Sequence, residues 1–94
     1  MKKAKEYAKQ YLQAEDKHKV LSDIILEFFD ESQELIKIRN AKIDGAIVAI
    51  IKELNEKWNA FARRTNGEVK EDGFINLVKS KLPFMADYLE NIGI

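Results

Sequence analysis

Cysteine is absent from the 94 residues, histidine and proline occur once each, and glycine occurs only four times. The lack of cysteine excludes disulfides, thiolate metal ligands and cysteine nucleophiles. The single histidine, His18, cannot build a zinc site without several carboxylate partners, and it leaves little scope for a serine triad. The few glycines match no phosphate-binding fingerprint. We therefore predict that the chain is not an enzyme and has no cofactor and no catalytic, cofactor-binding or metal-binding residues.

Long hydrophobic runs are also missing from the chain. The most apolar stretch, residues 46–51, has six residues, whereas ~20 are needed to span a bilayer. The basic start is followed by no apolar run, so it does not match a secretory signal. We expect no membrane span and, by default, a cytoplasmic location. Hydrophobic residues make up 46% and charged residues 34%, which suits a single globular domain over residues 1–94.

Apolar residues recur at helical spacing along the whole chain, and few glycines or prolines interrupt them. This pattern predicts an all-α fold, a small helical bundle of four to five helices that could be built on a long antiparallel helical hairpin. The approximate helices are residues 2–15, 17–39, 44–65, 73–81 and 83–91. Candidate N-caps are Asp44 and Asp72, and candidate helix ends or interruptions are Asn40, Asn66-Gly67 and Pro83.

The first two of these helices could also be one continuous helix. Positions 4, 7, 11, 14, 18, 21, 25, 28, 32 and 35 alternate three and four apart without a break, which allows a single helix over residues 1–39. The alternative is a break near residues 15–19, with Asp16 as the N-cap of the second helix. The first segment has a weak apolar stripe that a homodimer would complete, and a continuous helix would favour such a dimer.

The helix over residues 44–65 is apolar almost all round its first half and is expected to form the buried centre of the bundle. Trp58 and Phe61 continue its stripe without a change of phase, so we interpret them as core residues. Their position beside Arg63 and Arg64 is also typical of binding anchors. His18 falls on the long apolar stripe and is interpreted as a partly buried spacer.

Charge is balanced overall but unevenly distributed. Sixteen basic and sixteen acidic residues cancel, which disfavours general nucleic-acid binding. Residues 20–35 nevertheless contain five acidic residues and no lysine or arginine. This acidic stripe consists of Asp23, Glu27, Asp30, Glu31 and Glu34. Their spacing predicts one helix face, opposite the apolar stripe, that is either solvated or a docking surface for a basic partner, including nucleic-acid mimicry.

These features favour a non-catalytic protein–protein interaction module, such as an adaptor, an inhibitor or an immunity-type factor. Reversing Glu27 and Glu31 to lysine should then weaken partner binding. The alternative is a small nucleic-acid-associated regulator that uses the basic amino-terminal helix and the carboxy-terminal helix pair. The last helix offers Asp87, Glu90 and Asn91 but no lysine or arginine, which argues against base reading by that helix.

Overall fold

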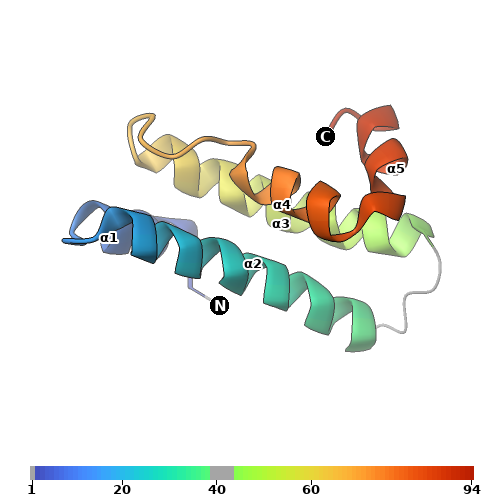
Figure 1. The fold of residues 1–94 in the computed structure, drawn as a ribbon, viewed down its shortest axis with the longest axis horizontal. Helices are drawn as coiled ribbons and strands as arrows, with labels where there is room; N and C mark the ends of the chain where they lie inside the picture. The colour runs from blue at the N-terminus through green and yellow to red at the C-terminus, as the bar shows by residue number, and fades with distance from the viewer. Residues whose placement is uncertain (1, 39–43) are drawn as a thin grey trace.

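The computed structural model describes residues 2–38 and 44–94, which form an all-α bundle (Figure 1). No strand occurs within these residues. The fold class predicted from the periodicity is therefore confirmed. The elements are α1 (Ala4–Leu12), α2 (Lys17–Ile38), α3 (Asp44–Arg64), α4 (Gly73–Lys81), the 3-10 turn η1 (Pro83–Met85) and α5 (Ala86–Asn91).

Helices α2 and α3 lie side by side and run in opposite directions along the 40 Å long axis of the molecule (Figure 1). Helix α1 lies behind this pair in the figure and contacts both helices, whereas α4 lies in front and also contacts both. The η1 turn follows α4 and leads into α5, which turns away at the end of the molecule where α3 begins. The turn expected at Asn40 falls outside the described residues.

The chain breaks between the first two helices, so the continuous-helix alternative is wrong. Helix α1 ends at Leu12, earlier than the residue 15 expected, because residues 13–16 form the turn that folds it back along α2 and α3. The Asp16 carboxylate accepts a hydrogen bond of 3.1 Å from the backbone N–H of Lys19. This is the geometry of an N-cap, which satisfies one of the amide groups left free at a helix start.

Helix α1 buries most of its apolar stripe against the rest of the chain, while Leu12 at its end is 37% exposed. Tyr7, Ala8 and Tyr11 are 0%, 4% and 7% exposed, respectively. The sequence-based argument for a homodimer assumed a continuous first helix that one chain could not cover. That condition is not met, because the folded-back α1 is covered by α2 and α3.

An aromatic cluster joins four of the helices at the centre of the bundle. The Phe28 ring on α2 lies 5.3 Å from Tyr7 of α1, 5.2 Å from Trp58 of α3 and 5.7 Å from Phe74 of α4, measured between ring centroids. Phe61 packs edge-on against Trp58 at 5.0 Å. Such pairs contribute about 0.5–1.5 kcal/mol each beyond the area they bury. Trp58 and Phe61 are both fully buried, so their assignment to the core is confirmed.

Helices α3 and α4 are joined by a loop, and the two ends of this loop are stabilised in different ways. Helix α3 stops as predicted at Asn66-Gly67, which adopt positive φ angles of 57° and 85°. Asp72 occupies the N-cap position of α4, but its side chain makes no capping hydrogen bond, so the predicted cap is wrong. Instead the Asp72 carbonyl accepts a hydrogen bond of 2.9 Å from Asn76 N–H, and Trp58 Nε1–H donates to the Lys70 carbonyl at 3.0 Å.

Candidate functional site

The acidic stripe lies along one flank of α2, but its five carboxylates do not share one environment. Asp23, Asp30 and Glu34 are exposed. Neither of the two ion pairs found within residues 2–38 and 44–94 involves the stripe. Leu26, which is 50% exposed, lies one helical turn from both Asp23 and Asp30. The outer part of the stripe therefore combines unpaired negative charge with an exposed apolar side chain.

Glu27 is exposed but lies beside the amino-terminal helix and contacts it. The Tyr7 hydroxyl donates a hydrogen bond of 2.6 Å to Glu27 Oε1, and the backbone N–H of Lys2 donates to the same hydroxyl at 3.3 Å. Burial raises the pKa of Tyr7 well above its ordinary range, and the hydrogen bond to the Glu27 carboxylate raises it further. The nearby charge of Glu31, which is half-buried, acts in the same direction.

The predicted stripe therefore divides into two parts with different roles. Glu27 is exposed but contacts α1, and Glu31 is half-buried beside this contact, whereas the other three carboxylates make no such contact. The periodicity did not reveal this because the rotation of α1 about its own axis decides which carboxylate the tyrosine reaches. Asp23, Asp30 and Glu34, which we call the outer acidic face, are exposed.

A second feature is a cavity of about 350 Å³ between α2, the loop after α3 and the start of α4. Its apolar walls are Leu21, Ile25, Trp58 and Val69, and its polar edge includes Asp72. It is open to solvent rather than enclosed. Ligand pockets are usually lined by apolar groups with a few convergent polar ones. Within the described residues, none of those that line this cavity has a buried polar side-chain atom without a hydrogen-bond partner.

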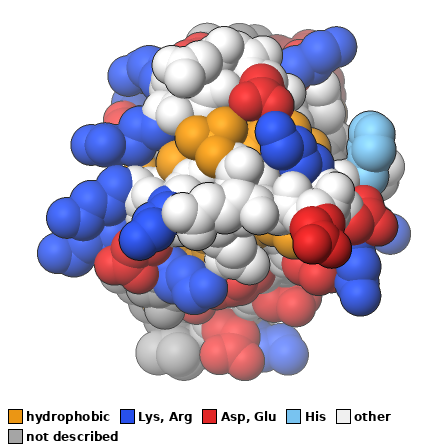
Figure 2. All heavy atoms as spheres, turned by 90° about the vertical axis from the view of Figure 1, so that its left-hand side faces the viewer, with side chains coloured by type: hydrophobic (Ala, Val, Ile, Leu, Met, Phe, Trp, Pro, Cys, Tyr) orange, Lys and Arg blue, Asp and Glu red, His pale blue; other side chains and the backbone are white. Residues whose placement is uncertain are grey.

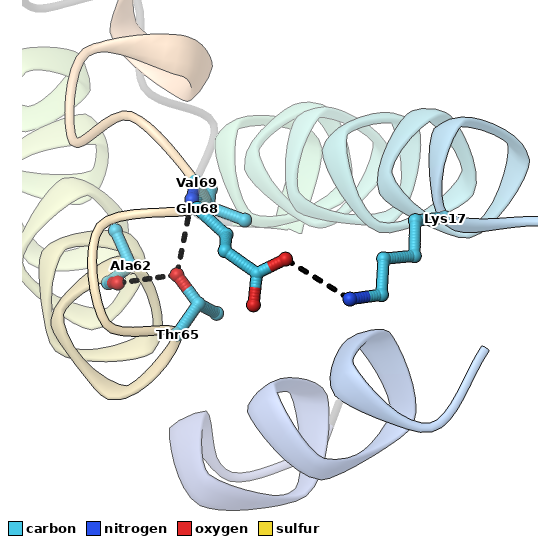
Figure 3. Close-up of polar contacts among 5 residues, drawn as sticks. All are labelled: Lys17, Ala62, Thr65, Glu68 and Val69. Atoms are coloured by element: carbon cyan, nitrogen blue, oxygen red, sulfur yellow. Dashed lines mark hydrogen bonds and ion pairs between the residues drawn. The ribbon is translucent and has the colours of Figure 1, made fainter.

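The loop beside this cavity is fixed at two points. Thr65 is fully buried; its hydroxyl donates to the Ala62 carbonyl at 2.6 Å and accepts from the Val69 backbone N–H at 3.0 Å. Glu68 points toward Lys17 at the start of α2, and their charged atoms lie 2.9 Å apart (Figure 3). The loop is thus held to α2 by an ion pair and to α3 by a buried hydroxyl.

The same end of the molecule carries a mixture of side-chain types. Figure 2 looks at the end formed by the α1–α2 turn and the loop after α3, where apolar side chains show at the centre and charged side chains of both signs surround them. His18, in the first turn of α2, is exposed, so its interpretation as a partly buried spacer is wrong. That interpretation depended on a continuous apolar stripe through residue 18, whereas the structure has the exposed start of α2 at this position.

Two further structural observations bear on chemistry. Within the described ranges, acidic and histidine side chains do not gather in groups of three or more that could hold a metal ion. The described helices also include none with both the length and the apolar character needed to cross a bilayer.

One surface feature, at the carboxyl-terminal end of the described residues, was not predicted from the sequence. The last helix was expected over residues 83–91, but residues 83–85 form a 3-10 turn and the α-helix begins at Ala86. Among the apolar residues of this segment, Met85 and Leu89 are fully buried. Phe84, Tyr88 and Ile92 are 60%, 44% and 46% exposed. The buried Met85 and Leu89 are also four residues apart, so the spacing alone does not separate the exposed set from the buried one.

No protein-family model, curated protein or solved structure matches the chain.

Proposed function

We propose that the protein is a non-catalytic interaction module, such as an adaptor, an inhibitor or an immunity-type factor, that binds a basic protein surface through the outer acidic face of α2. One observation carries the proposal. Asp23, Asp30 and Glu34 are exposed along α2, and no cation of the described residues pairs with them.

The physical reason is the energy of like charges on one helix flank. Carboxylates one turn apart repel by about 0.2–0.5 kcal/mol per pair. A basic partner would relieve this repulsion and would be attracted from a distance, which raises the association rate and selects partners by charge. Exposed Leu26 lies between Asp23 and Asp30 and supplies an apolar contact, which exposed charges alone lack.

The contact between Tyr7 and Glu27 decides which variant tests this proposal. Reversing Glu27 would remove the acceptor of the Tyr7 hydroxyl and loosen α1, so a loss of binding would have two explanations. Asp23→Lys with Asp30→Lys changes the charge of the outer acidic face by the same amount and disturbs no contact of the described residues. Glu53→Lys with Glu56→Lys is the matched control, since both residues are exposed on α3.

The experiment is an affinity pull-down from native host lysate with the wild type, the α2 variant and the α3 control, with and without nuclease. We expect one protein to be recovered by the wild type and the control and lost with the α2 variant. Added salt should also weaken its recovery. Equal recovery by all three would contradict docking through this face. Recovery of nuclease-sensitive complexes would favour the nucleic-acid alternative instead.

A further inference from the structure

The exposed side chains of Phe84, Tyr88 and Ile92 form a strip along η1 and α5, which we call the C-terminal apolar strip. They follow one another at intervals of four residues, so each lies about one helical turn from the next. Single exposed apolar residues are common on proteins, whereas adjoining ones mark interaction surfaces. Among the described residues, three of the five exposed large apolar side chains belong to this short segment.

The strip is held in place by the structure around it. The Ile94 N–H donates to the Leu89 carbonyl at 2.9 Å and the Gly93 N–H donates to the Glu90 carbonyl at 3.1 Å, while Gly93 has a φ of 81°. These are the two hydrogen bonds and the left-handed residue of a Schellman motif, which closes a helix end. Leu89 is fully buried and Ile94 packs against the core. Ile92 is therefore exposed as part of a helix end that backbone hydrogen bonds hold in place.

Negative charge lies among the strip residues, and the nearest lysines in the sequence, Lys79 and Lys81, belong to the last turn of α4. Residues 82–94 contain Asp87 and Glu90 and no lysine, arginine or histidine. Both carboxylates are exposed, and Asp87 lies directly before Tyr88 and three residues after Phe84. An anionic membrane surface would be repelled by such a border, whereas a cationic protein surface would be attracted.

We propose that the C-terminal apolar strip binds an amphipathic helix of another protein whose apolar face is flanked by lysine or arginine. The apolar face of such a helix covers Phe84, Tyr88 and Ile92, and its cations meet Asp87 and Glu90. Amphipathic helices are commonly recognised in this way, through apolar anchors spaced by one turn. The surface is separate from the outer acidic face of α2, so the protein would have two docking surfaces.

The test uses two dye-labelled synthetic helical peptides with the same apolar pattern of leucines, one carrying lysines and the other glutamates. Binding to the full chain is measured by fluorescence anisotropy. We expect the leucine–lysine peptide to bind and the leucine–glutamate peptide to bind at least about tenfold more weakly. Phe84→Ser with Ile92→Ser should weaken the first interaction by at least about tenfold, as expected when anchor residues are lost. Leu26→Ser, which removes an exposed apolar side chain from α2, should leave it unchanged.

A charge exchange tests the acidic border. Asp87→Lys with Glu90→Lys should transfer the preference to the leucine–glutamate peptide, whereas Asp23→Lys with Asp30→Lys should not. Because all the substituted residues are exposed, the circular dichroism spectra and unfolding midpoints should stay close to those of the wild type. Equal affinity of the wild type for both peptides, or loss of binding only in the α2 variants, would overturn the proposal. A wild-type dimer in sedimentation that Phe84→Ser with Ile92→Ser converts to monomer would also overturn it, since a second copy would then occupy the strip.

Discussion

Helix α1 and the η1–α5 segment are both short and amphipathic, but they use their large apolar residues differently. Helix α1 directs Tyr7 and Tyr11 inward against α2 and α3 and leaves lysines on its outer side. The η1–α5 segment buries Met85 and Leu89 but exposes Phe84, Tyr88 and Ile92. Helix α1 lies against two long helices, whereas the largest contact of α5 is with the turn that leads into it. An apolar residue at helical spacing is therefore buried only where a neighbouring element covers it.

Truncating one aromatic residue on each segment should give the largest difference between the two segments in the free energy of unfolding. Tyr7→Ala should lower the free energy of unfolding by about 3–5 kcal/mol, because it leaves a cavity beside Phe28 and Phe61. Phe84→Ala should change it by less than about 0.5 kcal/mol, since the ring is mostly in water. Urea unfolding followed by circular dichroism measures both. Similar losses for the two variants would mean that the segments do not differ in this way.

A smaller effect concerns the hydroxyl of the same tyrosine. Tyr7→Phe removes the hydrogen bond to Glu27, which we expect to cost about 1 kcal/mol, below the usual value for a charged acceptor because Glu27 is exposed. The raised pKa of Tyr7 also makes stability depend on pH. Above pH ~10 a tyrosine in the unfolded chain loses its proton while the folded one keeps it, which favours unfolding.

The wild type should therefore lose stability relative to Tyr7→Phe as the pH rises above ~10, by up to about 1.4 kcal/mol per pH unit. Unfolding free energies of both proteins between pH ~8 and ~11 measure the difference. The variant Glu27→Gln should keep most of this decline, because burial is the largest cause of the shift. Parallel curves for the wild type and Tyr7→Phe would show that the hydroxyl is not buried as described.

A substitution at the end of α5 should change the free energy of unfolding by an amount similar to, or smaller than, that of Tyr7→Phe. Gly93→Ala places a side chain on a residue with a φ of 81° and should destabilise the protein by about 1 kcal/mol. It should also loosen Ile92 and weaken any binding to the C-terminal apolar strip. Gly45→Ala is the control: a Cβ there meets nothing within 4 Å, and alanine favours the helical conformation of α3. Thermal unfolding should therefore shift in opposite directions for the two variants, and a shift in the same direction would contradict the described helix end.

The smallest effect is expected at the surface near α1. Lys17→Met removes the ion pair with Glu68, whose side chains are 39% and 43% exposed, and should cost less than about 1 kcal/mol at low salt. High salt should reduce the difference further. A loss as large as that of Tyr7→Ala would mean that surface charge, rather than aromatic packing, holds this end together. The unfolding free energies of the wild type and Lys17→Met in low and high salt distinguish these two possibilities.

The sequence predicted those features that depend on neighbouring residues. The end of α3 at Asn66-Gly67 follows from the tolerance of these residues for positive φ, and Asp16 caps α2 through an amide three residues away. Trp58 and Phe61 were recognised as core because they continue a long stripe. In each case the sequence signal lies in residues that are close together along the chain.

Features set by contacts between distant segments were missed. The partner of Glu27 is a tyrosine 20 residues earlier, and nothing in the spacing within α2 indicates it. The exposure of Phe84 and the burial of Met85 depend on which side of η1 packs against α4, which local periodicity does not report. Asp72 has a suitable residue type for an N-cap, yet its side chain makes no capping hydrogen bond. The candidate docking residues were thus found by type, whereas their division into inner and outer sets required the structure.

The position of Trp58 gives this protein a built-in spectroscopic probe. It is the only tryptophan of the chain and has no exposed surface, so its emission should report the aromatic cluster and the adjoining loop after α3. Unfolding should move this emission to longer wavelengths, whereas a ligand on α5 or on the outer flank of α2 should leave it almost unchanged. Stability can therefore be followed by intrinsic fluorescence in the same sample in which a dye-labelled partner reports binding.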